Sequence, residues 1–241
     1  MTTPSHPAVN EAASTADFEF AALNEARNYR RALAREFGPH LRGKVLEVGA
    51  GIGQMTLAFR ALPGVSEIVG VEPDARFHAG FVSNNPQVRL VRGIVSDVPE
   101  RTGWDAIVSV NVLEHIEHDE AELKSWAGLL REKHGRVCIF VPARPEIYAP
   151  IDRDFGHFRR YTRPELRGKL ERAGFTVERL VYFNLTGYFA WWLNFRVRQQ
   201  RTFGIGSVRF YDRFVFPWVH WSESRICRPP IGQSLLAVAR A

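Results

Sequence analysis

Three glycines at alternate positions follow a short apolar run and precede a helix-like stretch. The run VLEVGAGIGQMT spans residues 45–56, and its glycines are Gly49, Gly51 and Gly53. Glycine accepts positive φ and lets a ligand approach the backbone closely, so this loop predicts a site for a nucleotide or cofactor. The spacing differs from the G-x-G-x-x-G pattern of dinucleotide-binding oxidoreductases, which makes such an enzyme the weaker alternative. The acidic Glu47 before the loop favours a cationic group over a pyrophosphate.

Two later segments supply polar residues at the ends of apolar runs. Glu72 lies 19 residues beyond Gly53 and is followed by Pro73. This is about the offset at which an acidic residue binds the hydroxyls of a ribose. Asn111 and Val112 end a further run. Because ligands bind at the carboxyl ends of the strands in an open parallel sheet, we expect these residues to meet the glycine loop at one rim.

The elements that must position these residues alternate along the chain. Apolar runs typical of strands cover residues 44–48, 67–71, 88–91, 104–110, 136–141, 175–183 and 234–239. Stretches of helical periodicity lie between them, and residues 20–37 form a helical stretch before the first run. Asp119 with Glu122, and Thr162 with Glu165, have the spacing of capping boxes that open helices. The alternation predicts an α/β fold with a Rossmann-like, mostly parallel sheet and helices on both faces.

Three motifs together resemble those of class I S-adenosylmethionine-dependent methyltransferases. They are the loop Glu47–Gly53, the triplet Glu72–Asp74 and the segment Val110–Ile116, which reads VNVLEHI. The resemblance covers residues 24–183 and the last apolar run. It implies that S-adenosylmethionine is the cofactor and that methyl transfer is the activity. It also implies a seven-stranded sheet whose last strand, within residues 232–240, runs antiparallel.

The resemblance further implies roles for residues around the cofactor. The glycine loop would contact the methionine portion, Glu72 would bind both ribose hydroxyls, and the strand end at Asn111 would support the reacting sulfonium. Ile94 or Val95 would flank the adenine ring, and Asp97 would reach its amino group. Tyr29, in the helix before the first strand, would lie over the methionine carboxylate, and simple packing of this ring is the equal alternative.

Two histidines follow strands at the predicted rim. His115 comes shortly after the fourth predicted strand, and His157 lies in a polar insertion, residues 142–161, after the fifth. Such insertions commonly cover active sites as lids. Because a histidine with a pKa near neutrality can remove a proton from a methyl acceptor, both are candidate catalytic residues. The alternatives are a hydrogen bond from His115 to nearby backbone and a structural role for His157 in its loop.

The insertion ends in a dense set of polar side chains. Arg159, Arg160 and Tyr161 follow one another, and arginine can hold a phosphate or carboxylate through two parallel hydrogen bonds. We predict that these three residues bind the acceptor, with a solvated charged face as the alternative. Cys138 and Cys227 are the only cysteines, and no metal-ligand spacing is present, so the sequence predicts no metal ligands.

Residues 182–221 interleave aromatic and arginine side chains around a single acid, Asp212. This section could pack over the acceptor pocket, lie on an anionic membrane surface, or form a contact between subunits. Nucleic-acid binding is disfavoured, because the net charge of +6 is modest and no RNA-binding motif is present. The sequence does not specify the oligomeric state.

The chain of 241 residues divides into four predicted parts. They are a lead of residues 1–20, a cofactor-binding core of 21–183, a basic aromatic helical section of 184–231 and a final core strand in 232–241. Neither a secretory signal nor an apolar run long enough to span a bilayer is present. A cytoplasmic location is therefore expected, with peripheral contact to the inner membrane face if the aromatic section binds lipid.

The sequence also resembles methyltransferases associated with glycan and lipid-linked sugar pathways. This resemblance implies a methyltransferase for a small-molecule, lipid-linked or glycan-linked acceptor, with oxygen as the favoured acceptor atom. The aromatic, arginine-rich section of residues 182–221 suits an acceptor with a large apolar part. A non-catalytic protein of the same fold that docks to membranes or partners is the main alternative, and a nicotinamide-dependent oxidoreductase is the weaker one.

Overall fold

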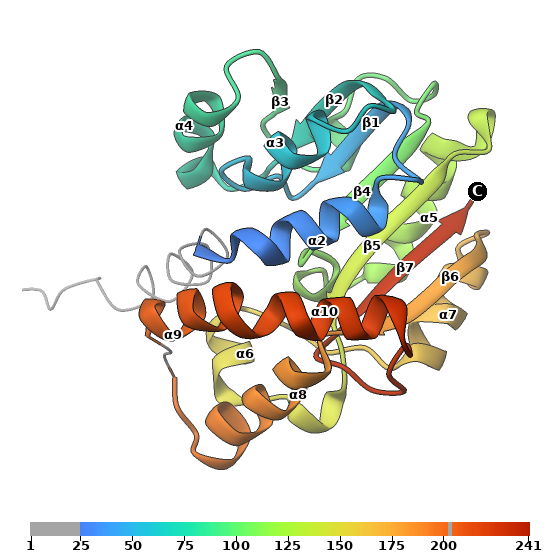
Figure 1. Ribbon diagram of the computed structural model, residues 1–241. Helices are drawn as coiled ribbons and strands as arrows, with labels where there is room; N and C mark the ends of the chain where they lie inside the picture. The colour runs from blue at the N-terminus through green and yellow to red at the C-terminus, as the bar shows by residue number, and fades with distance from the viewer. Residues whose placement is uncertain (1–24, 202–203) are drawn as a thin grey trace, which may run out of the picture.

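The computed structural model describes residues 25–201 and 204–241, which form one sheet flanked by helices (Figure 1). Its strands lie in the spatial order β3-β2-β1-β4-β5-β7-β6. They are β1 (Gly43–Val48), β2 (Val65–Val71), β3 (Arg89–Val91), β4 (Ala106–Val110), β5 (Arg136–Pro142), β6 (Thr176–Phe183) and β7 (Ser234–Arg240). The predicted lead of residues 1–20 lies outside the described residues.

The strand directions match the sequence-based prediction. Neighbouring strands from β3 across to β5 pair in parallel, and β7 lies between β5 and β6, antiparallel to both. The predicted seven-stranded sheet with an antiparallel last strand is therefore confirmed. The chain crosses from β3 at one edge to β4 on the far side of β1. This reversal of strand order creates the crevice in which open α/β sheets bind their ligands.

Helices cover both faces of the sheet, as predicted (Figure 1). On one face α5 (Asp119–Leu130) and α7 (Arg163–Arg172) contribute to the core, and on the other α2 (Arg27–Phe37), α3 (Gln54–Arg60) and α10 (Phe216–Arg225) do so. The remaining elements of this part are α4 (Ala75–Asn84) and the short turns η1 (Val95–Asp97), η2 (Leu113–His115) and η3 (Arg131–Lys133). Successive strand residues point to opposite faces, so each apolar strand serves both cores.

One predicted helix start is confirmed and one is wrong. The hydroxyl of Thr162 accepts from the amide of Glu165 at 3.3 Å, which is the predicted capping box of α7. Helix α5 instead begins after His118, which makes no side-chain cap. Asp119 is the first residue of that helix, and its carboxylate is turned toward Lys169 at 2.8 Å. A buried lysine offers the carboxylate a stronger partner than a backbone amide.

The section after β6 is helical, as predicted. It contains α8 (Leu185–Trp191), η5 (Trp192–Val197), α9 (Ile205–Phe210), η6 (Tyr211–Val215) and α10. Asp212 joins this section to the core, because its carboxylate accepts the amides of Asn28 and Tyr29 at the start of α2, each at 2.9 Å. Glu223 similarly accepts the amides of Asn184 and Leu185. These carboxylates satisfy helix N–H groups that would otherwise lack partners.

The insertion between β5 and α7 is held against this helical section. It contains η4 (Pro145–Ile147) and α6 (Pro150–Asp154). The guanidinium of Arg160 lies 4.4 Å from the ring centre of Trp191, a cation–π contact. Within the described ranges, none of the helices combines the length and apolar character required to cross a membrane.

Candidate active site

A cavity of about 520 Å³ lies at the carboxyl ends of β1, β2 and β4. Strand ends and the loops after them supply Glu47, Gly49, Ala50, Ile52, Glu72, Pro73, Asp74, Val110, Asn111, Val112 and His115. The helices and the insertion add Ala26, Tyr29, Gln54, Met55, Arg76, Phe77 and Phe155. The C-terminal part of the chain adds Asn184, Val208, Tyr211, Asp212 and Gln233. The predicted strand-end rim and the aromatic section thus wall a single cavity.

Glu47 is the buried acid of this cavity. Its carboxyl is 3 % exposed and accepts a hydrogen bond from the Thr56 hydroxyl at 2.5 Å. Burial raises the pKa of Glu47 to about 8, and the nearby carboxylate of Glu72 adds to the rise. A cationic group in the cavity would favour the ionised form of this acid.

Glu72 shares the cavity and is oriented by the backbone. Its two oxygens accept the amides of Gly51 and Asp74, each at 2.8 Å. Burial raises the pKa of Glu72, and these two amide hydrogen bonds oppose the rise. A carboxylate has about four acceptor positions, so one bond on each oxygen leaves capacity for two ligand hydroxyls.

The glycine loop depends on the absence of side chains. Gly49 has φ +73°, and a Cβ atom there would lie 2.2 Å from Cγ2 of Val112. Gly53 has φ +78°, and a Cβ atom there would lie 2.0 Å from the side-chain nitrogen of Asn85. Gly51 also has positive φ, at +54°, and donates its amide to Glu72. The loop therefore closes against its neighbours and brings its amides close to the rim.

Gln54 adds a polar group that sequence reasoning did not select. Its side chain lines the cavity, and both its amide nitrogen and its oxygen are buried without a hydrogen-bond partner among the described residues. An unsatisfied buried amide is costly unless a ligand or water completes its hydrogen bonds. The first position of α3, directly after the glycine loop, was the signal that could have identified it.

Tyr29 lines the cavity and is also packed into an aromatic cluster. Its ring centre lies 5.4 Å from that of Phe183 and 4.9 Å from that of Phe216. Its hydroxyl is hydrogen-bonded with Ser234 and Asn184, and burial raises the pKa of this phenol. Both sequence-based interpretations of Tyr29, packing and cavity contact, are compatible with this position.

The structure places some of the other predicted cofactor residues in the cavity wall and one outside it. Pro73, Asn111 and Val112 lie in the cavity wall. Asn111 adopts a left-handed conformation with φ +54°, which turns the chain sharply at the end of β4. Ile94 lies outside the wall and is 55 % exposed.

The two histidines lie together, but only one reaches the cavity. His115 lines it, and burial together with nearby His157 lowers the pKa of His115 to about 4. His157 lies behind it, with ring centres 4.6 Å apart. Nδ1 of His157 lies 3.1 Å from Oδ1 of Asp152, and the guanidinium of Arg160 donates to the same carboxylate at 2.8 Å.

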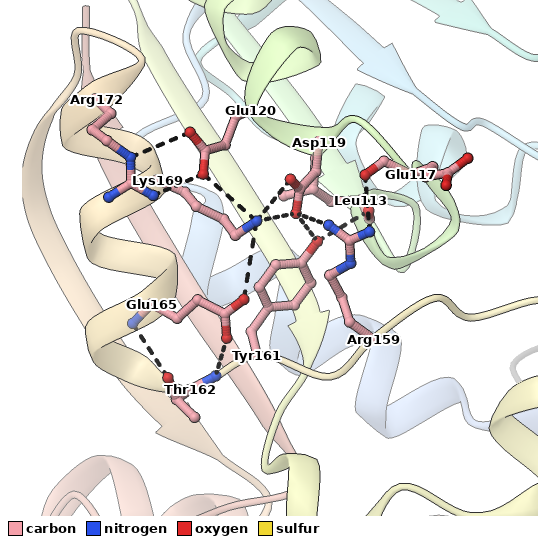
Figure 2. A network of polar contacts seen from close by, with 10 residues as sticks. All are labelled: Leu113, Glu117, Asp119, Glu120, Arg159, Tyr161, Thr162, Glu165, Lys169 and Arg172. Atoms are coloured by element: carbon pink, nitrogen blue, oxygen red, sulfur yellow. Dashed lines mark hydrogen bonds and ion pairs between the residues drawn. The ribbon is translucent and has the colours of Figure 1, made fainter.

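The three predicted acceptor-binding residues are engaged in internal contacts and do not line the cavity. Arg160 is 3 % exposed and pairs with Asp152. Figure 2 shows that Arg159 and Tyr161 both point to Asp119. The Arg159 guanidinium lies 3.0 Å from that carboxylate, and the Tyr161 hydroxyl donates to it at 2.8 Å. The dense charge of this segment therefore reflects internal ion pairing, and we do not retain an acceptor-binding role for it.

The residues that wall the cavity opposite the strand-end rim were not predicted individually. Phe155 comes from the insertion, and Asn184, Val208, Tyr211 and Asp212 come from the helical section. Their positions depend on how two distant segments pack over the rim, and no local sequence pattern predicts that packing. The glycine loop and Glu72 were found because the motif itself specifies their place at the strand ends.

Comparison with known proteins identifies the class of this chain. A family model described as a methyltransferase domain matches residues 20–180. No curated protein is a significant match to the sequence. A chain in the complex between the Haloferax volcanii Trm112 methyltransferase activator and its methyltransferase superposes with a TM-score of 0.62 at 16% identity, covering 98% of this chain and 99% of that one.

Two further solved structures have the same fold. A TehB-like S-adenosylmethionine-dependent methyltransferase from Corynebacterium glutamicum has a TM-score of 0.56 at 19% identity, covering 95% of this chain and 98% of that one. A Haemonchus contortus phosphoethanolamine N-methyltransferase, solved with phosphomonomethylethanolamine and S-adenosylhomocysteine, has a TM-score of 0.58 at 14% identity, covering 89% and 52%. The chain therefore belongs to the methyltransferase-domain family and is an enzyme whose cofactor is S-adenosylmethionine.

Proposed function

We propose that the protein methylates an oxygen atom of an amphiphilic acceptor, either a small molecule or a lipid-linked compound. The observation that carries the proposal is the make-up of the cavity, which joins an acidic strand-end rim to a wall of Phe155, Val208 and Tyr211. The rim matches a charged, polar cofactor, and the opposite wall matches an acceptor with apolar surface.

The residues of the rim fit S-adenosylmethionine. Glu72 is positioned to accept both ribose hydroxyls, and Glu47 lies where a cationic group would be stabilised. The buried amide of Gln54 offers a donor and an acceptor to the cofactor. The bound cofactor supplies a methyl group that is already activated by the sulfonium. The protein then contributes mainly alignment and exclusion of water.

The acceptor hydroxyl must also lose a proton, and the histidine pair is suited to promote that loss. His115 lines the cavity beside Asn111 and Val112, the residues that end β4. His157 is held behind it by Asp152. We therefore retain His115 as the candidate catalytic residue that contacts the acceptor, with His157 as the residue that positions it.

An exposed aromatic stripe favours an acceptor at a membrane surface. Phe210, Phe214, Trp218 and Trp221 recur at intervals of four, four and three residues along α9, η6 and α10, and each is more than half exposed. The opposite side of the same helices holds the buried side chains that pack on the core, such as Phe216. Helices with this division lie in the interface of a bilayer, with their aromatic side inserted.

Arginines accompany the aromatic stripe. Arg213 is exposed, and its guanidinium lies 5.4 Å from the ring centre of Phe214. Arg209 is also largely exposed. Positive charge beside interfacial aromatic side chains complements anionic headgroups. We propose that the stripe docks the enzyme on an anionic bilayer, which would present a lipid-linked acceptor to the cavity.

The test is a methyl-transfer assay with S-adenosylmethionine labelled in its methyl group. The full-length protein is incubated separately with a polar-lipid extract and with a water-soluble extract of its source cells. We expect label to enter the organic phase and to resist mild alkali, as a methyl ether does and a methyl ester does not. Label confined to water-soluble products would contradict the lipid-linked acceptor. Absence of transfer to either extract, with cofactor binding intact, would contradict both proposed classes of acceptor.

A further inference from the structure

Glu114, His115 and His157 form a cluster of potential metal ligands beside the cavity. One ligand atom from each side chain lies within 4.8 Å of those of the other two. Glu114 and His115 belong to the turn η2, directly after β4, and His157 comes from the insertion. Glu114 is fully buried. A carboxylate with two imidazoles is a recurrent ligand set for Zn²⁺ and for other divalent transition-metal ions.

The two segments that supply these residues are fixed to each other. The amide of Phe158 donates to the carbonyl of Glu114 at 2.9 Å. The hydroxyl of Tyr161, which donates to Asp119, also lies 3.1 Å from the carbonyl oxygen of Leu113. The cluster is therefore formed without any movement of the insertion.

The surroundings of His157 are those of a metal-bound histidine. Its Nδ1 lies 3.1 Å from a carboxylate oxygen of Asp152. That carboxylate is held in turn by the guanidinium of Arg160 at 2.8 Å and by the amide of Ala149 at 2.9 Å. Histidines that bind metals commonly donate one ring N–H to a carboxylate, which orients the ring and directs the other nitrogen to the ion.

We propose that Glu114, His115 and His157 bind one divalent transition-metal ion, with Zn²⁺ as the ion that best suits the ligand set. The donors of a tetrahedral zinc ion stand roughly 3.4 Å apart, given metal–ligand lengths near 2.1 Å. The two ligand atoms that are farthest apart would therefore approach one another by at most about 1.4 Å. Rotation of the side chains can supply a shift of this size. Three protein ligands leave a fourth position for water or substrate, as in catalytic zinc sites.

The position of His115 gives this ion a role in the proposed function, on which this step rests. Because His115 lines the cavity, an ion bound to it would lie beside the space proposed for the acceptor. An acceptor hydroxyl bound there would have a lowered pKa, so its O–H bond would break and the proton would pass to water. The histidines would then promote deprotonation as ligands, and neither would need to take up the proton.

The test measures metal binding apart from activity. Full-length protein carrying Cys227→Ser, which removes an exposed thiol, is freed of metal with a chelator and titrated with Co²⁺ and Zn²⁺. We expect one ion per chain, a visible Co²⁺ absorption spectrum typical of nitrogen and oxygen ligands, and displacement of Co²⁺ by Zn²⁺. Glu114→Gln, His115→Gln and His157→Gln should each weaken binding by at least about 100-fold. His118→Gln, at an exposed histidine three residues from His115, should leave it unchanged.

Binding of S-adenosylhomocysteine to each variant shows whether the protein has kept its fold. Absence of saturable Co²⁺ and Zn²⁺ binding by the unsubstituted cluster would overturn the proposal. The proposal would also be overturned if the cluster variants that still bind S-adenosylhomocysteine bound metal as tightly as His118→Gln does. Methyl transfer that persists in metal-free protein would remove the catalytic role of the ion and leave the proposed methyltransferase function standing.

Discussion

At the scale of single residues, the proposed cofactor site depends most directly on Glu72. Its carboxylate is held by the amides of Gly51 and Asp74, so it needs little rearrangement to accept ribose hydroxyls. We expect Glu72→Ala to weaken S-adenosylhomocysteine binding by about 10- to 100-fold, because hydrogen bonds to a charged acceptor contribute roughly 1.5–3 kcal/mol. Isothermal titration calorimetry measures this loss. Glu67→Ala, at an exposed acid on β2, is the control, and equal affinities for the two variants would show that the ribose lies elsewhere.

The buried acid Glu47 predicts a particular dependence of stability on pH. Its pKa is raised from 4.5 to about 8, so between these values the folded protein holds a proton that the unfolded chain has released. The free energy of unfolding should therefore fall with rising pH, by up to about 1.4 kcal/mol per pH unit. Glu47→Gln removes this titration and keeps a partner for Thr56. Urea unfolding of both proteins from pH 5 to pH 8 gives the difference, and parallel pH profiles would contradict the raised pKa.

The sequence identified individual residues well where a motif sets their geometry, and poorly where partners come from distant segments. Glu47 and Glu72 share the cavity as expected, because each ends a strand of a parallel sheet. Arg160 and Tyr161 were expected to face the acceptor, but their partners Asp152 and Asp119 hold them inside the protein. The cluster of Glu114, His115 and His157 was missed, since it joins two segments that no sequence spacing connects.

At the scale of elements, Asp119 holds α5, α7 and the insertion together. Figure 2 shows Lys169, Arg159 and Tyr161 converging on its carboxylate. Asp119→Ala would leave the buried ammonium of Lys169 without this partner, at a cost of about 3–5 kcal/mol in the free energy of unfolding. Urea unfolding measures the change.

Glu120→Ala is the matched control for Asp119, because it removes the neighbouring carboxylate, whose ion pairs are more exposed. This variant should lose much less stability than Asp119→Ala, because exposed ion pairs contribute little. Similar losses for the two variants would show that the buried network does not join these elements.

The order and type of the elements could be predicted because strand and helix periods alternate clearly from β1 to α7. The starting residue of α5 could not be predicted, because Asp119, the expected cap, is the first helical residue and pairs with a lysine 50 positions away. The packing of α8 to α10 could not be predicted from the sequence either. It depends on Asp212 and Glu223 accepting amides from other parts of the chain.

At the scale of the whole molecule, the aromatic stripe predicts reversible membrane docking. We expect the protein to float with vesicles that contain phosphatidylglycerol and to remain in solution with phosphatidylcholine alone, with less binding at high salt. Replacing Trp218 and Trp221 by serine should weaken binding at least about tenfold, since each indole loses apolar contact with the bilayer. Val82→Ser, at an exposed apolar residue of α4, is the control. Vesicle binding that is unchanged in the double variant, or self-association through the stripe without vesicles, would contradict the docking proposal.

We propose that the rim between Glu47 and Glu72 holds the cofactor. The most direct measurement is a crystal structure of the full-length protein with S-adenosylhomocysteine. We predict that both ribose hydroxyls will lie within hydrogen-bond distance of the Glu72 carboxylate, with the amino group on the side of Glu47 and the sulfur beside Asn111. A cofactor bound outside this cavity, or with its ribose turned away from Glu72, would contradict the account.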